Sequence, residues 1–432
     1  MAAVSRSEAR LLAIAAAVAV LVTAVGVGVR AFGHTMGTKT SPFVITWLPR
    51  ADVSWTVAAI AALGLLVAVG PLLLDGPRAP YVLGLMALAL GAGLTLNAAR
   101  NGTYGWDAVF DLGPGGSFEA KNEYLPALPA LSYGDRFFLD RFAELVPALP
   151  INAGGHPPGL LLFVHWTGLT TAGRFAALCI AATVLTAPLT YALARGCGLA
   201  ERHARLAGLL AAGAPSLLLF GMTSADAVFA CVGTAAAALL VRRSWWWRGA
   251  GALVLAAGAF SAWSLPAVGV FAALVTWRRD GWRQALALAV ASAVPFLALN
   301  AVLAAATGYD PIGTLHATSD LYDRSLARIR PYAYWWIGSP VAWAVMLGLP
   351  TAGAWLVATR RTDRVAVALA VVVVVAALAG FTKAEVERIW LFLVPPACVA
   401  AATVLPAGRL RGVLLALGVQ ALAVQLLFQT IW

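Results

Sequence analysis

Long apolar runs separated by short arginine-rich stretches are the feature that most limits what this chain can fold into. A helix needs about 20 mostly apolar residues to cross the hydrocarbon core of a bilayer. The runs that approach or exceed this length are 10–32, 53–74, 80–99, 174–195, 206–222, 225–241, 249–276, 284–305, 333–358, 364–381, 389–406 and 411–430. Charged residues make up only 11 % of the 432 residues, against about 25 % in soluble domains. The pattern predicts a multi-pass membrane protein and excludes a soluble enzyme and a disordered chain.

The positions of the basic residues predict the orientation of the runs. Lys and Arg concentrate in the short cytoplasmic loops of membrane proteins. If the N-terminus is inside, the inner loops hold 17 of the 30 Lys and Arg residues and only five of the 19 acids. These basic residues are Arg6, Arg10, Arg78, Arg195, Arg202, Arg205, Arg242, Arg243, Arg248, Arg278, Arg279, Arg283, Arg360, Arg361, Arg364, Arg409 and Arg411. The net charge of +11 is therefore a topology signal, and we exclude nucleic acid as a partner.

Three short segments need separate treatment. Run 249–276 has basic loops at both ends, so we expect a hairpin of two short helices that turns near Ser261–Pro266. Run 157–170 would reverse the later loops if it crossed the membrane, so we expect a helix lying on the outer surface. No small-residue cleavage site follows run 10–32, which predicts a retained anchor. The predicted fold is all-α, a polytopic bundle of about 11–13 spans with a long extracytoplasmic loop that carries short interfacial helices.

The outer face carries nearly all the polar residues that could do chemistry. The loop 100–173 is too long to be a plain connection, and it mixes aromatic side chains with seven acids. These acids are Asp107, Asp111, Glu119, Glu123, Asp135, Asp140 and Glu144. Shorter polar segments follow at 306–332 and 382–388, and a tight turn ends at Asp226. Solvated loop residues would give a similar pattern, so position alone does not identify a site.

Three motifs resemble those of the polytopic GT-C glycosyltransferases, which include protein O-mannosyltransferases and aminoarabinose transferases. The first motif runs from Asn122-Glu123-Tyr124 through Tyr133-Gly134-Asp135 to His156-Pro157-Pro158-Gly159, the second is Ser224-Ala225-Asp226, and the third is Glu387-Arg388-Ile389-Trp390 followed by Pro395-Pro396. Their order and predicted side resemble the family over roughly residues 80–400, most closely uncharacterised actinobacterial membrane proteins of this type. Asn122 stands where the family has the first acid of an Asp-Glu pair, and two extra runs precede the core.

The resemblance implies a division of the chain and an activity. Residues 1–79 would form two additional N-terminal helices, 80–406 the transmembrane core, and 407–432 a C-terminal helix. Such enzymes take a sugar from a polyprenyl-phosphate donor at the outer leaflet and transfer it to an extracytoplasmic glycan, lipid or protein. The expected location is therefore the cell membrane, with the site outside and membrane lipid around it. No organic cofactor is expected, since no P-loop or dinucleotide glycine pattern is present.

The reaction requires a base and a cation, and the motifs offer candidates for both. The acceptor hydroxyl must lose a proton to a carboxylate, for which Glu123 is the first candidate and Asp107 the second. The leaving phosphate gains charge, which the planar guanidinium of an arginine suits. We expect Arg388 there. The further candidates for substrate or phosphate binding are His156, Lys383, Tyr124, Asp226 and Arg330, while Asp111, Asp135 and Arg328 rank lower.

Other functions remain open at this stage. No spacing of His and Cys residues predicts a zinc site, and no metal is expected. A lipid-linked glycan transporter or flippase would carry charges inside its spans, which are almost uncharged here. A ligase that transfers whole glycans would use similar residues. A non-catalytic membrane partner of another enzyme would tolerate loss of Glu123 and Asp107.

Overall fold

The computed structural model describes residues 5–114 and 116–430, and this part of the chain is mostly helical. Its only paired strands are β1 (Thr46–Trp47) and β2 (Phe428–Gln429), which form a two-residue antiparallel pair. The all-α prediction is therefore confirmed. Residues 1–4 and 431–432, at the ends of the two predicted terminal regions, lie outside the described residues.

Six helical segments are long and apolar enough to cross a membrane. They are α1 (Arg6–Ala31), α2 (Val53–Val69) with η1 (Gly70–Leu74), α3 (Arg78–Asn101) with η2 (Gly102–Trp106), α8 (Ala172–Gly196), α13 (Trp282–Thr307), and η9 (Ala407–Arg409) with α20 (Leu410–Leu427). In α1 and α13, 6 % and 11 % of the apolar window is buried. A helix that leaves such a surface uncovered needs an apolar surrounding, which agrees with a multi-pass membrane protein.

Three runs that we expected to be single helices are broken, so the prediction of unbroken helices was wrong there. Run 206–222 divides into α9 (Glu201–Ala212) and a π-turn, η6 (Leu217–Gly221), because Gly213 and Pro215 interrupt it. Run 333–358 divides into α15 (Tyr332–Leu347) and α16 (Leu349–Arg360), which meet at 116°. Run 389–406 is interrupted at Trp390, after which η8 (Leu391–Leu393) continues directly into α19 (Val394–Ala402).

The break between α15 and α16 has a clear local cause. Gly348 adopts φ +105, a conformation that side chains other than glycine rarely reach, and Pro350 starts the next helix without a backbone donor. The remaining helices of the bundle are α10 (Asp226–Leu240), α11 (Trp245–Ala259), α12 (Pro266–Asp280), α17 (Arg364–Ala379) and α18 (Val386–Ile389). The expected hairpin within 249–276 is confirmed as α11 and α12, with a break between Ala259 and Pro266.

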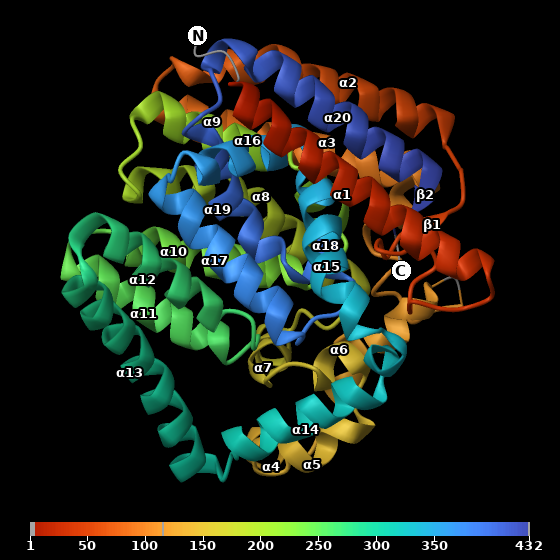
Figure 1. Ribbon diagram of the computed structural model, residues 1–432. Coiled ribbons are helices and arrows are strands. Elements are labelled where there is room, and N and C mark those ends of the chain that lie inside the picture. Colours follow the sequence, from red (N-terminus) through yellow and green to blue (C-terminus); the bar gives the residue numbers. More distant parts are fainter. Residues whose placement is uncertain (1–4, 115, 431–432) are drawn as a thin grey trace.

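The long segment between α3 and α8 folds into a series of short helices. They are η3 (Phe118–Asn122), η4 (Leu125–Leu131), α4 (Asp135–Asp140), α5 (Phe142–Leu145), η5 (Val146–Ala148), α6 (Ile151–Gly154) and α7 (Gly159–Thr167). Helix α7 matches the short helix expected at 157–170. Figure 1 shows these elements gathered at the lower end with α14 (Pro311–Arg324), which is followed by η7 (Leu326–Ile329).

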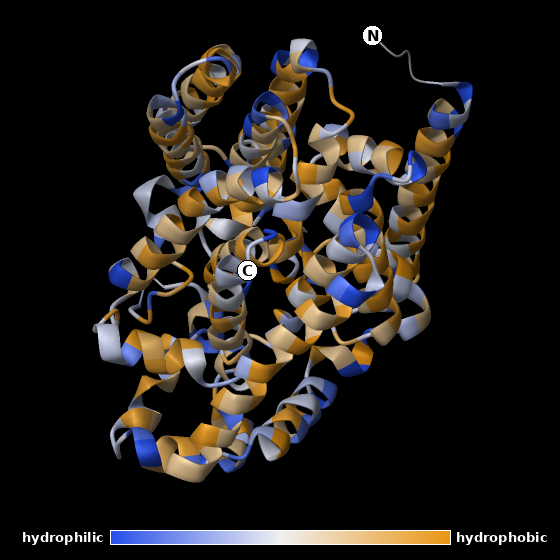
Figure 2. Cartoon of the chain, turned by 90° about the vertical axis from the view of Figure 1, so that its left-hand side faces the viewer, coloured by the Kyte–Doolittle hydropathy of each residue, from blue (hydrophilic) through white to orange (hydrophobic). Residues whose placement is uncertain are grey.

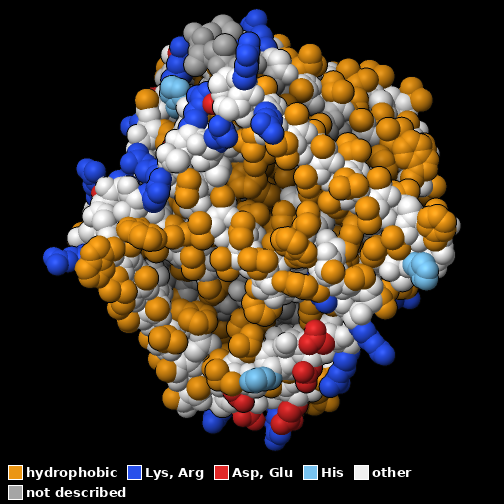
Figure 3. All heavy atoms as spheres, in the orientation of Figure 1, with side chains coloured by type: hydrophobic (Ala, Val, Ile, Leu, Met, Phe, Trp, Pro, Cys, Tyr) orange, Lys and Arg blue, Asp and Glu red, His pale blue; other side chains and the backbone are white. Residues whose placement is uncertain are grey.

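The predicted inner and outer loops lie at opposite ends of the bundle. At the upper end in Figure 1, near α9 and the start of α1, several predicted inner loops contact one another. Arg361 pairs with Glu8 at 2.7 Å, Arg364 bonds to the carbonyl of Cys197, and Arg279 bonds to that of Val241. Figure 2 shows mostly hydrophobic segments between the polar ends, and Figure 3 shows apolar side chains over one face, which is hollowed. Helix α19 runs through the centre with all nine of its residues buried.

Candidate functional site

Asp226 begins α10 and is buried. The turn before it places Ser224 so that its hydroxyl donates to Asp226 Oδ2 at 2.7 Å, and its oxygen accepts from the Asp226 backbone at 3.0 Å. The Asp226 carboxylate does not cap the helix, since the N-cap residue is Ala225 and the first-turn amide of Asp226 donates to Ser224 instead. Asp226 Oδ2 instead accepts a hydrogen bond from Arg388 at 2.8 Å. Its carboxylate is thus available to pair with another segment of the chain.

Arg388 connects three segments that are far apart in the sequence. Its Nη1 bonds to Asp226, while its Nη2 bonds to Glu385 Oε2 at 2.7 Å and to Asn152 Oδ1 at 3.4 Å. Burial alone would lower the pKa of Arg388, but the charges of Asp226 and Glu385 outweigh it and raise that pKa. Arg388 is therefore a fixed, fully charged group in the interior of the polar end.

Glu385 reaches its two arginines through an unusual turn. Ala384 and Glu385 both adopt positive φ angles, +68 and +59, which cost of order 1–3 kcal/mol each for residues with a side chain. The turn brings Glu385 within 2.6 Å of Arg330 and 2.7 Å of Arg388. Burial would raise the pKa of Glu385, but the two guanidinium groups outweigh it and lower that pKa to about 2. The ion pairs are the interaction that holds this turn.

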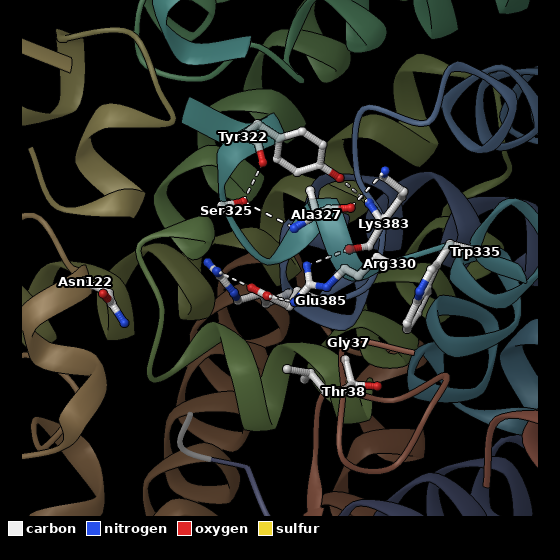
Figure 4. Close-up of polar contacts among 12 residues, drawn as sticks. Gly37, Thr38, Asn122, Tyr322, Ser325, Ala327, Arg330, Trp335, Lys383 and Glu385 are labelled. Carbon is white, nitrogen blue, oxygen red and sulfur yellow. Dashed lines mark hydrogen bonds and ion pairs between the residues drawn. The ribbon is translucent and has the colours of Figure 1, made fainter. Parts of the chain in front are cut away.

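Lys383 and Arg330 join the segment before α18 to the end of α14. Lys383 Nζ donates to the carbonyl of Ala327 at 3.1 Å, and Arg330 Nη1 donates to the carbonyl of Lys383 at 2.7 Å. The Lys383 amide also donates to the hydroxyl of Tyr322 at 2.8 Å. Figure 4 shows Arg330 directed toward Glu385 and the Lys383 carbonyl, while the Lys383 side chain turns toward Ala327. Lys383 and Arg330, both predicted to bind substrate or phosphate, thus connect these two segments of the chain.

Glu123 lies beside this network and is only 2 % exposed. Its Oε1 accepts from Asn152 Nδ2 at 2.8 Å, while Oε2 has no hydrogen-bond partner within the described chain. Burial raises the pKa of Glu123 to about 8, although the charge of Arg388 partly opposes the shift. A carboxyl group with a pKa near neutrality can both accept and release a proton at physiological pH.

Tyr124 and His156 form the aromatic side of the same region. His156 stacks on Phe229 with ring centroids 5.2 Å apart, and its Nδ1 lies 2.7 Å from the carbonyl of Asn152. A carbonyl only accepts, so Nδ1 carries a proton and Nε2 is the acceptor in the neutral ring. Burial lowers the pKa of His156, which favours that neutral form. The buried Tyr124 hydroxyl has no partner within the described residues, and its ring lies 6.2 Å from that of His156.

The other predicted acids do not join this network. Asp107 makes no side-chain hydrogen bond to it within residues 5–114 and 116–430; its Oδ2 lies near the start of α8, where a Cβ added to Gly173 would be 3.9 Å away. Burial, followed by the charge of Asp111, raises the pKa of Asp107. Asp111 Oδ1 accepts from the Gly113 amide, which forms a local turn. Asp135 accepts from Trp166 at 2.7 Å and so shapes the loop.

Asn122 and Glu387, two further motif positions, contact neighbours other than Arg388. Asn122 donates to Glu119 at 2.7 Å, and Figure 4 shows it apart from the contacts around Arg330. Glu387 is fully buried and accepts from the Val44 amide at 2.8 Å, while its Oε2 has no partner in the described part of the chain. Burial raises the pKa of Glu387 to about 7. Arg388 therefore pairs with Glu385 and Asp226, and Glu387 instead holds the segment after α1.

Asn152, like Glu385, is a member of the network that the sequence did not predict as a site residue. Its amide bonds to both Glu123 and Arg388, and its carbonyl accepts from His156. An asparagine in a loop is common, and its only signal is its place four residues before His156, which lies just beyond the end of α6. Its amide links the two charged groups, because it donates to a carboxyl oxygen of Glu123 and accepts from the guanidinium of Arg388.

Comparison with known proteins leaves the family undetermined. No protein-family model matches the chain, and no curated protein matches it. Within the described residues, no group of three or more His, Cys, Asp or Glu side chains is arranged to hold a metal ion. The site consequently consists of one carboxyl group with a raised pKa, a neutral imidazole, a buried tyrosine and an arginine held between two carboxylates.

Proposed function

We propose that the protein is a membrane glycosyltransferase of the GT-C kind, which moves a sugar from a polyprenyl-phosphate donor to an extracytoplasmic glycan, lipid or protein. In this proposal the broken runs still complete about 11–13 crossings of the cell membrane. The end that carries loop 100–173 faces outward. The contacts among predicted inner loops at the opposite end support this orientation, because they group the loops as the positive-inside rule does.

The convergence of Glu123, Asn152, Asp226 and Arg388 is the observation that carries the proposal. Glu123 is the C-cap of η3, and the other three residues lie in α6, α10 and α18. Hydrogen bonds join all four within one buried network. Burying charges is costly unless they are paired. A fold that needed only stability would gain as much from apolar packing in this position. Buried ionisable groups with shifted pKa values are more frequent at functional sites than elsewhere.

Glu123 is the proposed base of the transfer. The acceptor hydroxyl oxygen forms a bond to the anomeric carbon, and its proton passes to Glu123 Oε2, the oxygen without a partner. The bond between the anomeric carbon and the phosphate oxygen breaks, and the electron pair remains on the polyprenyl phosphate. Asn152 holds the other carboxyl oxygen and so orients the group. A positioned base of this kind contributes roughly 10²–10⁴-fold to a rate.

Arg388 is the proposed contact of the leaving phosphate. Because Arg388 is already paired with two carboxylates, it can bind phosphate only if one of them moves away. Two arginines, Arg330 and Arg388, face two carboxylates, Asp226 and Glu385, so the four charges sum to zero. An incoming phosphate must therefore take the place of a carboxylate on Arg388. Asp226 is the better candidate to move, since Glu385 is held by both arginines. His156 Nε2 and the Tyr124 hydroxyl are proposed to contact the sugar or the acceptor.

Radiolabelled transfer in proteoliposomes tests this function directly. The full chain would be assayed with a set of polyprenyl-phosphate sugars, and the wild type compared with Glu123→Gln. Glutamine keeps the acceptor for Asn152 but cannot take a proton. We expect transfer to fall at least 100-fold. Glu144→Gln is the matched control, because Glu144 is an exposed acid of the same segment that pairs only with Arg141; its rate should equal that of the wild type.

Two results would contradict the proposal in different ways. Full transfer by Glu123→Gln would remove Glu123 as the base while leaving the activity in place. No transfer from any donor by the folded wild type would instead favour a non-catalytic membrane partner.

A further inference from the structure

A cavity of about 480 Å³ lies at the arginine-rich end of the bundle, away from the network of Glu123 and Arg388. Four segments meet around it: the start of α3, the end of α8, the start of α9, and the turn between α10 and α11. The residues that line it are Arg78, Tyr191, Arg195, Glu201 and Arg242. Their polar groups have no part in the function proposed above.

The charges around this cavity are mostly positive. Three arginines line it with a single carboxylate, Glu201. That carboxylate is already shared, because Arg195 lies 3.3 Å from one oxygen while Arg205 and Tyr191 bond to the other at 2.9 Å. Its negative charge therefore does not neutralise the lining. An anion entering the cavity would meet an uncompensated positive charge of about two.

Two of the arginines have donors that the protein itself does not use. The buried Nε of Arg242 has no hydrogen-bond partner within residues 5–114 and 116–430. Arg78 lies over the ring of Tyr191, 5.6 Å from its centroid, and donates no hydrogen bond to the described chain. Most buried donors in proteins are paired. Arg242 also lies over the ring of Trp247, 5.3 Å from its centroid. Guanidinium groups with unused donors around one cavity suit a phosphate, since each can donate to two of its oxygens.

The surroundings of the cavity point to a lipid as the source of that phosphate. Trp245, Trp246 and Trp247 follow Arg242 at the start of α11 and are 48 %, 90 % and 49 % exposed. Exposed tryptophans of this kind lie at the headgroup level of a bilayer. Basic pockets between helices at the cytoplasmic side bind the headgroups of anionic lipids. A phosphate at this depth would be carried by the adjacent leaflet.

We propose that Arg78, Arg195 and Arg242 form a site for the phosphate headgroup of an anionic lipid. The bound headgroup would join the start of α3, the end of α8 and the turn after α10, from which these three arginines come. The site does not depend on the glycosyltransferase proposal, so either can fail alone.

Native mass spectrometry of the purified full chain in detergent tests the proposal. Phosphatidylglycerol would be compared with phosphatidylcholine of the same acyl chains and with inorganic phosphate. The double variant Arg78→Gln with Arg242→Gln removes the two arginines with unused donors. We expect the wild type to retain phosphatidylglycerol in preference to phosphatidylcholine, and the double variant to lose at least tenfold in affinity, because each arginine near a lipid headgroup contributes about 1 kcal/mol.

The control variant is Arg202→Gln, at the same end of the bundle but paired with Asp75 and outside the cavity lining. Equal unfolding temperatures without added lipid would show that all three proteins are folded. Equal phosphatidylglycerol affinity in the double variant and the control would overturn the site. If the wild type bound inorganic phosphate and did not retain phosphatidylglycerol in preference to phosphatidylcholine, a lipid would be ruled out as the occupant of the site.

Discussion

Arg388 and Arg330 are buried between Asp226 and Glu385 at one end of the bundle, whereas Arg78 and Arg195 stand exposed around an open cavity at the other. The first pair faces as many carboxylates as arginines, and its charges are largely removed from water. The second has more arginines than carboxylates, and water solvates them. The comparison shows that ion pairs fix the arginine side chain in one place, whereas in the other it lies exposed beside a cavity.

A substitution should therefore lower the free energy of unfolding more at the buried arginines than at the exposed ones. Breaking a buried ion pair by removing one partner leaves the other charge without compensation and costs roughly 3–5 kcal/mol. An exposed pair is worth about 0–1 kcal/mol. Each of the following predictions uses this difference, and they are ordered from the largest expected effect to the smallest.

Arg388→Met should produce the largest loss of stability. The substitution keeps the length of the side chain but leaves Asp226 without its arginine and Glu385 with Arg330 alone. We expect the free energy of unfolding to fall by about 3–5 kcal/mol, measured as a lower midpoint of thermal unfolding in detergent. Arg202→Met is the control at the other end. Equal shifts in the two variants would show that the buried network contributes no more than a surface pair.

The rate of sugar transfer should rise with pH if Glu123 is the base. Only the ionised carboxylate accepts a proton, and burial raises the pKa of Glu123 to about 8. We therefore expect the rate to increase close to tenfold per pH unit from pH 6 to 7 and to level off above pH 8. Rates would be measured in proteoliposomes at saturating donor. A rate that does not change between pH 6 and 9 would contradict the assignment of Glu123.

The sequence predicted the helical class and the separation of the two polar ends, because hydropathy and arginine placement act over whole segments. It also predicted the break near Ser261, since basic loops on both sides required the chain to return. It failed at Gly348 and around Pro215, where local backbone chemistry breaks runs that are apolar throughout. The average hydropathy of a run does not show where a glycine or proline breaks the helix.

The site was predicted less completely than the fold. Glu123, His156, Asp226 and Arg388 were chosen from motifs, and the structure brings all four together. Asp107 was chosen for its distance from a span, and it makes no hydrogen bond to the network within the described residues. Asn152 was not chosen, because its role arises from contacts between α6 and two distant segments that no local pattern encodes.

Glu387→Gln should change how stability depends on pH. The pKa of Glu387 is raised to about 7 in the folded protein, above the ordinary value of about 4.3. The folded state therefore holds the proton more tightly, and the wild type loses stability as the pH rises from about 4 to 7. Glutamine keeps the acceptor for Val44 and does not titrate. Relative to the wild type, the variant should gain on the order of 1–3 kcal/mol between pH 5 and pH 8.

Unfolding midpoints at pH 5 and pH 8 measure this change, and Glu144→Gln again serves as an exposed control. The wild type and Glu387→Gln should converge toward pH 5, where both positions are neutral. If the unfolding midpoints of the wild type and Glu387→Gln changed equally with pH, Glu387 would be ionised in the folded protein at neutral pH. Another group would then stabilise the charge on its buried oxygen.

The smallest expected effect concerns the exposed pair of Arg202 and Asp75, whose nearest atoms are 3.4 Å apart with more than half of each side chain exposed. Asp75→Asn should lower the free energy of unfolding by no more than about 1 kcal/mol. Even that difference should vanish in 1 M NaCl, where the Debye length is about 3 Å. The loss in Arg388→Met should persist in the same salt, because ions do not enter the buried network. If salt instead removed both effects, the Arg388 network would be open to solvent, and the raised pKa of Glu123 would have lost its physical cause.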